Sequence, residues 1–465
     1  MNNNKLTKKY GLFTAICMVA GIVIGSGVFF KATDVFKNNG GDMVKSLLTV
    51  LLVGSLMTIC AYTFSILAGK HSNVNGVVDY AEATCGKAHA YTIGWFMSAV
   101  YYPAIASTLA WVSALYTCFL FEIDLTSPIR TIITVAYMLG GFALNILAPK
   151  LSGKFQVSTT VIKLIPLAIM AIVGTVVGLI NGQTIENLTA DTSAVAATVS
   201  GSTGFFGAIV AFAFAYEGWI IATCINAELH EPKKNLPKAL IIGTVLVITV
   251  YLTYFIGIGS MLSAKEIIDA GSNLPKIAFT KLFGGNAVFG TIAYSLIIVS
   301  CLGTMNGVIL ATCRGFYSLA ARNQGPAPKV IEKVNQKFNM PMLSSVIGLL
   351  LSGAWLLHRE LDFFGKLPEI LSYGNDELPI IALYALYIPI FINMMIKSKE
   401  LHPVKRFVFP SLSILACCFM IYCAFASYQL DAIYFILLLS LIMIVGMMFY
   451  RDKKGKSLIY RLFYK

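Results

Sequence analysis

Long hydrophobic stretches alternate with short polar segments along almost the whole chain. Twelve of these stretches are long enough to cross ~30 Å of hydrocarbon as helices. They cover approximately residues 10–37, 44–68, 88–120, 129–148, 155–180, 203–227, 238–262, 287–320, 342–357, 378–396, 407–427 and 430–450. The ninth is short, and the segment 358–375 after it is expected to hold a surface helix. The pattern predicts an all-α integral membrane protein in which residues 1–465 form a single transmembrane domain.

Composition supports this interpretation. Of the 465 residues 57% are hydrophobic and only 12% are charged, whereas a soluble domain contains about 25% charged residues. The net charge of +13 could suggest nucleic acid as a partner, but the basic residues lie in the short segments between apolar spans. Most of them fall on the side of the N-terminus, which predicts that both termini are cytoplasmic in a multi-pass protein of the cell membrane.

The ten cysteines lie almost entirely inside apolar stretches and have no metal-ligand spacing. We interpret them as small core hydrophobes, and only Cys118, near the outer end of a span, is a candidate for a bridge to a partner. No nucleophile with a base and no paired carboxylates on facing spans are evident. We therefore expect no enzyme activity, metal, cofactor or obligatory protein partner, and we expect lipid and a small molecule as the binding partners.

The first span carries three glycines and a serine at membrane depth, in residues 21–30, which read GIVIGSGVFF. Each Gly inside a helix costs roughly 1 kcal/mol relative to Ala, so the cluster favours unwinding. Unwound backbone in hydrocarbon is tolerated only when it is buried in protein or lines a wet cavity. Gly21 and Gly25 also form the G-x-x-x-G pattern of close helix packing. From this segment alone, a binding break and a packing face both remain open.

The sixth span is interrupted in the same way. Residues 212–220 read FAFAYEGWI and place the ionisable Glu217 beside a glycine in mid-membrane. Two Gly-interrupted segments at corresponding positions indicate inverted repeats with a binding site where they meet. We assign residues 1–180 to the first repeat, 203–396 to the second, and 407–450 to two additional helices.

Opening a helix frees N–H groups at one half-helix and C=O groups at the other, with partial charges of opposite sign. The freed N–H groups, together with a serine hydroxyl, can hold a carboxylate at Gly25, Ser26 and Gly27. The freed carbonyls can accept hydrogen bonds from an ammonium near Val23, Phe214 and Glu217. Two such opposed sets suit a free amino acid and would suit a sugar or a hydrocarbon poorly.

These segments resemble a known family. The runs GIVIGSGVF and FAYEGW, then ELHEPKKNLP at 228–237 and CLGTMNG at 301–307, look like the amino acid/polyamine/organocation (APC) superfamily. Within it the sequence is most similar to the bacterial L-type amino acid transporters and serine/threonine exchangers. The resemblance covers about spans 1 to 10. It implies the LeuT fold, with a 5+5 inverted repeat and broken helices 1 and 6.

The resemblance also implies roles for single residues. The expected substrate-binding set is Val23, Gly25, Ser26, Gly27, Phe214, Ala215, Glu217 and Asn306. Within it, Phe214 would close over the substrate as a gate, with core packing as its alternative. Asn306 in span 8 would contact the substrate, with helix–helix hydrogen bonding as its alternative. Glu217 departs from the family, which often has Asp or a small residue there, so its role stays open.

Lys163 lies about eight residues into span 5, ~12 Å deep by helical rise. An unpaired charge there costs at least a few kcal/mol, so the ammonium needs acceptors. In sodium-independent members of the family a lysine here takes the place of a sodium ion. The resemblance thus implies that Lys163 bonds to the broken backbone of span 1 and to span 8. Pairing with Glu217 and snorkelling toward the surface are the alternatives.

Weaker candidates lie elsewhere in the spans and loops. Tyr101 and Tyr102 in span 3 would face the pocket or only pack, and Tyr384 in span 10 would line a vestibule. Arg314 is expected to reach cytoplasmic carbonyls or water. The loop after span 2 would lie on the cytoplasmic face with solvated charges at His71, Asp79 and Glu82.

Together these features predict a secondary active transporter of amino acids that works by alternating access. Small neutral substrates are favoured mainly by the resemblance, and transport would be sodium-independent exchange or proton-coupled symport. Two alternatives stay open. One is an amino acid sensor or receptor on the same fold, and the other is a transporter of cationic amino acids or amines, for which Glu217 would be the anchor.

Overall fold

The computed structural model describes residue 8 and residues 10–25, 27–71, 76–199, 202–373 and 377–451. These residues are nearly all helical, and their β-bridges are isolated pairs, Tyr10 with Leu229 and Asn335 with Met340. Twelve helices or runs of consecutive helices in this part of the chain are long and apolar enough to cross a membrane. The predicted all-α membrane architecture is confirmed.

The first half of the chain contains the helices of the first five predicted spans and short helices between them. They are α1 (Leu12–Val23), α2 (Gly27–Phe30), α3 (Ala32–Asn38), α4 (Met43–Ala68), α5 (Gly76–Cys85), α6 (Lys87–Phe96), η1 (Met97–Tyr101), α7 (Tyr102–Leu120), α8 (Pro128–Leu147), α9 (Pro149–Ile169), η2 (Met170–Gly174), α10 (Thr175–Ile180), α11 (Gln183–Thr189) and α12 (Ser193–Thr198).

The second half is built in the same way. Its elements are α13 (Gly204–Tyr216), η3 (Trp219–Glu228), α14 (Pro232–Met261), α15 (Ala264–Ala270), η4 (Gly271–Asn273), α16 (Leu274–Leu282), α17 (Ala287–Ala320), α18 (Pro328–Ile331), α19 (Met342–Phe363), η5 (Glu369–Leu371), α20 (Leu378–Lys397), η6 (Val404–Val408), α21 (Phe409–Tyr428) and α22 (Leu430–Met448).

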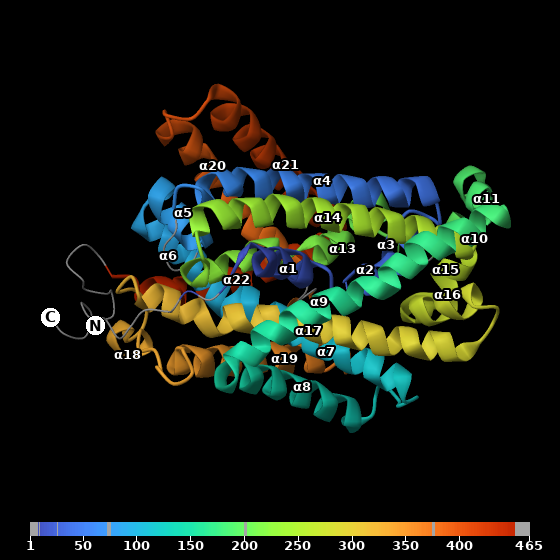
Figure 1. Ribbon diagram of the computed structural model, residues 1–465, viewed down its shortest axis with the longest axis horizontal. Helices are drawn as coiled ribbons and strands as arrows, with labels where there is room; N and C mark the ends of the chain where they lie inside the picture. The colour runs from blue at the N-terminus through green and yellow to red at the C-terminus, as the bar shows by residue number, and fades with distance from the viewer. Residues whose placement is uncertain are drawn as a thin grey trace.

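The long helices run roughly side by side along the longest axis of the molecule (Figure 1). Short helices cap both ends of this bundle: α5 and α18 lie at one end, and α11, α15 and α16 at the other (Figure 1). We call these the α5 end and the α11 end. The distribution of basic residues predicts that the α5 end is cytoplasmic, and that orientation stays a prediction.

Burial separates central from peripheral spans. The most apolar stretch of the sixth span, Gly204–Asn226, is completely buried, whereas only 17% of the corresponding stretch of Leu430–Met448 is. Large apolar side chains such as Ile132, Ile172 and Leu350 are exposed on the outer helices. An apolar outer surface is expected where lipid rather than water is the solvent. The centre of the bundle is therefore where a binding site would be shielded from lipid.

The ninth span differs from its prediction. Helix α19 continues to Phe363 instead of ending near residue 357 and giving way to a surface helix. The reason is a buried ion pair, because Nη2 of Arg130 on α8 lies 2.8 Å from Oε2 of Glu360. The charge of Glu360 is thus neutralised inside the bundle, and the only helical turn between α19 and α20 that the described residues contain is η5.

Spans 1 and 6 are both interrupted, as predicted. The described residues of the other spans contain no comparable loss of helix, although π-helical turns occur at η1, η2 and η6. The assignment of residues 1–180 and 203–396 to two inverted repeats rests on the positions of the two interruptions, and it stays a prediction.

Candidate functional site

The first interruption begins where α1 ends, at Val23. Ile24 is extended, with φ −71° and ψ 96°, and helix resumes at Gly27. Ser26, which is predicted from the sequence to bind a carboxylate, lies outside the described residues. The backbone on both sides of it is buried.

The two glycines of the G-x-x-x-G pattern also pack against neighbouring helices. A Cβ atom on Gly21 would lie 2.1 Å from Oγ1 of Thr160 on α9, and one on Gly25 would lie 2.6 Å from Oγ1 of Thr304 on α17. Real Cβ contacts are essentially never shorter than 3.0 Å, so both positions require glycine. The two interpretations of this segment therefore hold together: it is a helix break and also a close-packing face.

The second interruption follows Tyr216, the last residue of α13. Glu217 is extended, with φ −80° and ψ 160°, and Gly218 has a left-handed φ of 109°. This conformation favours glycine, and a Cβ atom at Gly218 would also lie 2.6 Å from Cγ2 of Ile22. The chain then continues as the 3-10 helix η3, so the sixth span changes helix type at the break.

The two breaks touch each other. A Cβ atom on Gly27 would lie only 2.5 Å from Cα of Ala215, so the backbones of spans 1 and 6 are in direct contact here. The hydroxyl of Tyr251 on α14 lies 2.9 Å from the carbonyl oxygen of Val23 and 2.9 Å from that of Ala215. The one hydroxyl hydrogen of Tyr251 is thus shared between a freed carbonyl of each broken helix.

Sequence reasoning missed Tyr251. Its span also contains Tyr254 and Phe255, and nothing in an apolar run with three aromatic residues distinguishes the one whose hydroxyl faces a break. Only the packing of α14 across both broken helices identifies it.

Lys163 on α9 is completely buried. Its ammonium donates hydrogen bonds to the carbonyl oxygens of Gly21 at 2.7 Å and Ile24 at 2.5 Å, and to Oγ1 of Thr304 at 3.1 Å. The acceptors are carbonyls at the C-terminal end of α1, where the helix dipole attracts a cation. Lys163 therefore bonds to the backbone of span 1 and to the Thr304 side chain of span 8. It neither snorkels toward the surface nor pairs with Glu217.

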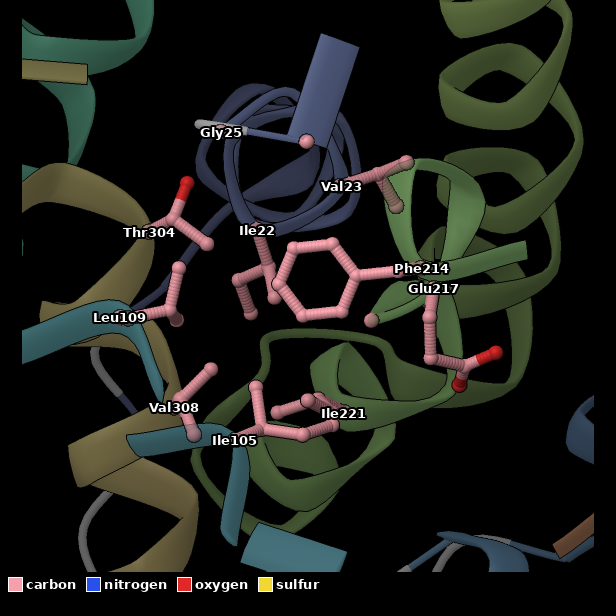
Figure 2. A pocket seen from close by; sticks show the side chains of 12 residues that line it. Ile22, Val23, Gly25, Ile105, Leu109, Phe214, Glu217, Ile221, Thr304 and Val308 are labelled. Atoms are coloured by element: carbon pink, nitrogen blue, oxygen red, sulfur yellow. The ribbon is translucent and has the colours of Figure 1, made fainter. Parts of the chain in front are cut away.

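A small cavity of about 20 Å³ lies between the breaks. That is room for about one water molecule. Spans 1, 3, 6 and 8 supply its lining, which consists mostly of apolar side chains and glycines: Ile22, Val23, Gly25, Gly27, Ile105, Leu109, Phe214, Glu217, Gly218, Ile221, Thr304 and Val308. The ring of Phe214 lies among these side chains and fills the space between them (Figure 2). An amino acid would fit only after this ring moves.

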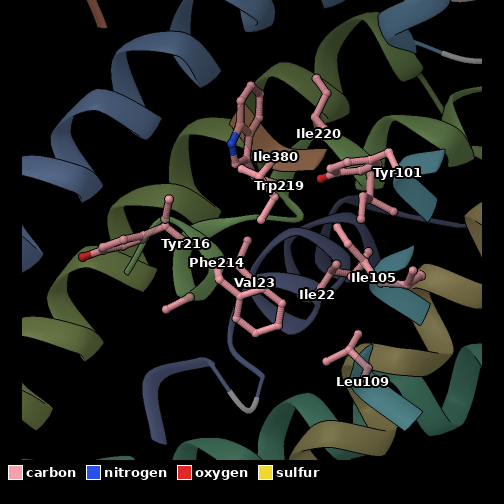
Figure 3. Close-up of a cluster of buried hydrophobic side chains, with 14 of the residues drawn as sticks. Ile22, Val23, Tyr101, Ile105, Leu109, Phe214, Tyr216, Trp219, Ile220 and Ile380 are labelled. Atoms are coloured by element: carbon pink, nitrogen blue, oxygen red, sulfur yellow. The ribbon is translucent and has the colours of Figure 1, made fainter. Parts of the chain in front are cut away.

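The same side chains continue into a larger apolar cluster (Figure 3). Phe214 and Tyr216 leave the end of α13 in different directions, and Trp219 lies on the far side of the break from Phe214 (Figure 3). Both Tyr216 and Trp219 are fully buried. The packing holds the ends of the broken span in place, and of these three aromatic residues only Phe214 lines the cavity.

Of the predicted binding set, Val23, Gly25, Gly27, Phe214 and Glu217 line the cavity. Ala215 lies directly behind the lining, in contact with the backbone of span 1. Of the two other members, Ser26 lies outside the described residues, and Asn306 is absent from the lining.

Asn306 is part of a hydrogen-bond network between helices. Its Oδ1 accepts from Nδ2 of Asn145 at 2.9 Å and from Oγ of Ser152 at 3.0 Å. Its Nδ2 donates to Oε1 of Gln156 at 3.1 Å and to the carbonyl oxygen of Ser152 at 3.2 Å. Both amide atoms are therefore already bonded, and the helix–helix alternative describes this residue. Span 10, expected to form one wall, contributes no lining residue either.

The aromatic candidates of spans 3 and 10 lie outside the lining. Tyr101 is fully buried, and its hydroxyl donates a hydrogen bond to Oε1 of Glu217. Tyr102 packs against Tyr101, with ring centroids 5.6 Å apart, and Tyr384 packs against Tyr387 at 5.7 Å. Tyr101 thus acts on the site through Glu217, and the other two are packing residues.

Buried ion pairs lie on both sides of the cavity. Beyond α2, Nζ of Lys31 lies 2.7 Å from Oε1 of Glu377 and 5.8 Å from the centroid of the Phe214 ring. Toward the α5 end, Nη2 of Arg314 lies 2.5 Å from Oε1 of Glu228. Nη1 of Arg314 also donates a hydrogen bond to the carbonyl oxygen of Leu310 at 3.3 Å. The expectation that Arg314 reaches carbonyls is thus met in part, but its charge is paired with Glu228 inside the bundle.

Two further expectations are overturned by burial. Asp79 lies on α5 with its side chain fully buried and forms an ion pair with Arg322, which also bonds to Glu82 at 3.1 Å. Asp79 is therefore no solvated charge. Cys118 is fully buried, so its thiol is not accessible for a bridge to a partner.

Comparison with known proteins places this geometry in context. The family model for amino acid permeases matches residues 10–457. The serine/threonine exchanger SteT of Bacillus subtilis (strain 168) is 30% identical over 405 residues, covering 87% of this chain and 86% of that protein. The human cystine/glutamate transporter is 24% identical, covering 90% of this chain and 80% of that protein. The human b(0,+)-type amino acid transporter 1 is 25% identical, covering 86% and 79%.

Proposed function

The chain belongs to the amino acid permease family, and we propose that it exchanges small neutral amino acids across the cell membrane by alternating access, without sodium. The observation that carries this proposal is the meeting of two broken helices around a central cavity. Freed N–H groups at one break and freed carbonyls at the other match the two charges of a zwitterion.

Lys163 supports sodium independence. Its ammonium is bonded to two carbonyls of the first break and to a hydroxyl of span 8. Carbonyl and hydroxyl oxygens around a single positive charge are also what a sodium ion would require. A protein that carries this charge on its own side chain does not need the ion to hold span 1 to spans 5 and 8.

The lining supports a small neutral side chain. Its side walls are Ile22, Ile105, Leu109, Ile221 and Val308, and the lining contains no lysine, arginine or histidine that could attract an acidic side chain. The carboxylate of Glu217 is turned away from the Phe214 ring (Figure 2) and is bonded to Tyr101, which disfavours it as an anchor for a cationic side chain. Similarity to a serine/threonine exchanger agrees with small neutral substrates.

Counterflow in proteoliposomes tests the proposal. Vesicles loaded with unlabelled serine, threonine or alanine should accumulate the labelled amino acid well above empty vesicles, equally in sodium and in choline buffers. Lysine and glutamate loaded at the same concentration should give little stimulation. Counterflow that requires sodium would contradict the assigned role of Lys163. Binding of an amino acid without any counterflow would instead favour a sensor.

A further inference from the structure

Glu217 is an ionisable residue at the second break, and the proposed transport function alone gives it no role. Its side chain is 6% exposed, and its carboxyl accepts hydrogen bonds from the Tyr101 hydroxyl and from the backbone N–H of Gly218. Tyr101 belongs to η1 in the third span, whereas Glu217 lies in the break of the sixth. This hydrogen bond therefore joins two spans across the binding region.

No cation neutralises this carboxyl. Among the described residues, Glu217 forms no ion pair with a lysine, arginine or histidine, and its hydrogen-bond partners are neutral. The two buried lysines of the region have other partners: Lys163 bonds to span 1, and Lys31 pairs with Glu377.

The titratable groups that face Glu217 are phenols and, one layer further out, thiols. Tyr101 approaches from η1, and Tyr384 and Tyr387 approach from α20. Behind these two tyrosines lie Cys60 of α4 and Cys417 of α21. Phenols and thiols are normally uncharged near neutral pH. Inside the closed site, only a proton can remove the charge of Glu217.

An ionised carboxyl without a counter-ion is strongly disfavoured in a membrane interior. A protonated carboxyl can stay buried, because its carbonyl oxygen still accepts from Tyr101. When the break opens to water, the carboxyl becomes hydrated and can release its proton to a water molecule. Before the site closes again, the carboxylate must take a proton back from water.

We propose that Glu217 is the proton-binding site of this carrier and that the site closes only while this carboxyl is protonated. The inference rests on the proposed transport function and adds to it a proton that occupies the closed carrier. In exchange, the proton passes in with one substrate and out with the next, so the rate depends on pH without a net proton flux.

The test is the pH profile of amino acid exchange with equal pH on both sides of the membrane. In the wild type, the rate should fall by about tenfold per pH unit once the carboxyl ionises in the open carrier. In Glu217→Gln, which carries no titratable group there, whatever exchange remains should be independent of pH over the same range. Glu266→Gln is a matched control, because Glu266 is a surface residue paired with Lys281 at 2.9 Å, and it should keep the wild-type profile.

The outcomes separate the two proposals. A flat profile in the wild type, or the wild-type slope in Glu217→Gln, would overturn the proton site while leaving exchange intact. Loss of cationic substrates alone in Glu217→Gln would overturn it in favour of a cation anchor. No exchange by the wild type at any pH would refute the transport function itself.

A spectroscopic measurement covers the case in which Glu217→Gln does not exchange. Infrared spectra of the purified folded proteins should show a protonated carboxyl band in the wild type that is missing in Glu217→Gln. Identical spectra in the carboxyl region would overturn the proposal.

Discussion

The two helix breaks are built from opposite charges. At the first, the Lys163 ammonium is surrounded by oxygen atoms from Gly21, Ile24 and Thr304. At the second, the Glu217 carboxyl has a phenol and a peptide N–H as partners, and no cation from the described part of the chain. The first break is therefore held by a buried ammonium with three oxygen acceptors, whereas the second contains the carboxyl that we propose to bind a proton. The comparison suggests that span 1 is held to its neighbours while span 6 is the part that responds to substrate and solvent.

The largest effect is expected at the fixed break. Lys163→Ala removes the donor for two buried carbonyls and a hydroxyl, so span 1 loses its link to spans 5 and 8. Exchange should fall at least about 100-fold, equivalent to about 2.7 kcal/mol, while the purified protein still elutes as a folded species. Initial rates in proteoliposomes measure this.

Lys154→Ala is the matched control, because Lys154 lies on the same helix and is exposed. It should exchange at close to the wild-type rate. Normal exchange in Lys163→Ala, or equal loss in both variants, would show that the first break does not depend on its internal cation.

The next effect concerns the contact between the breaks. Gly27→Ala would drive a methyl group into the backbone of Ala215, 2.5 Å away. Separating the breaks should reduce exchange more than tenfold and destabilise the protein by about 1–3 kcal/mol.

Gly140→Ala on α8 serves as the reference, because a Cβ atom there meets nothing within 4 Å. Replacing a helical glycine at such a site should raise stability by up to about 1 kcal/mol. Thermal unfolding in detergent would distinguish the two variants, and equal stability would contradict the close contact.

A smaller effect is expected at Tyr251. Tyr251→Phe removes the one hydroxyl that is shared by a carbonyl of each break, which should cost about 1–3 kcal/mol and lower the exchange rate several-fold. Tyr254→Phe is a matched control, because Tyr254 is buried on the same helix and its hydroxyl has no hydrogen-bond partner among the described residues. If the two variants behave alike, the hydrogen bond of the Tyr251 hydroxyl to the breaks has no role in stability or exchange.

The smallest effect on transport is expected at Asn306, which lies outside the cavity lining. Asn306→Ala should lower thermal stability, because it leaves buried partners on α8 and α9 unsatisfied. The apparent KM for the amino acid should change less than about twofold. For comparison, the loss of a substrate contact that contributes 1.4 kcal/mol of binding free energy would raise it about tenfold. A large rise in KM with unchanged stability would restore Asn306 as a substrate ligand.

The sequence alone was sufficient to predict the breaks, because their causes are local. Clustered glycines and an ionisable residue inside apolar spans mark them, and an isolated lysine at depth indicates that acceptors must be nearby. Which acceptors Lys163 has could be predicted only through the resemblance to a family. They are carbonyls of span 1 and the Thr304 hydroxyl.

Partners distant in sequence could not be predicted. The ion pairs of Arg314 with Glu228 and Arg130 with Glu360 join residues from separate spans, and no local pattern shows which charges meet. The same holds for Tyr251, whose role depends on how α14 crosses two other helices. Asn306 is the opposite case. It is a polar residue near glycines on span 8, which lines the cavity, but its side chain faces neighbouring helices instead.

The most direct test of the central claim is an experimental structure with an amino acid bound. The account predicts that the carboxylate of the ligand lies against the N–H groups of residues 25–27, and that its ammonium lies against carbonyls near Val23, Phe214 and Glu217, with the Phe214 ring displaced. An amino acid bound elsewhere, or helices continuous through residues 24–27 and 217–218, would contradict it.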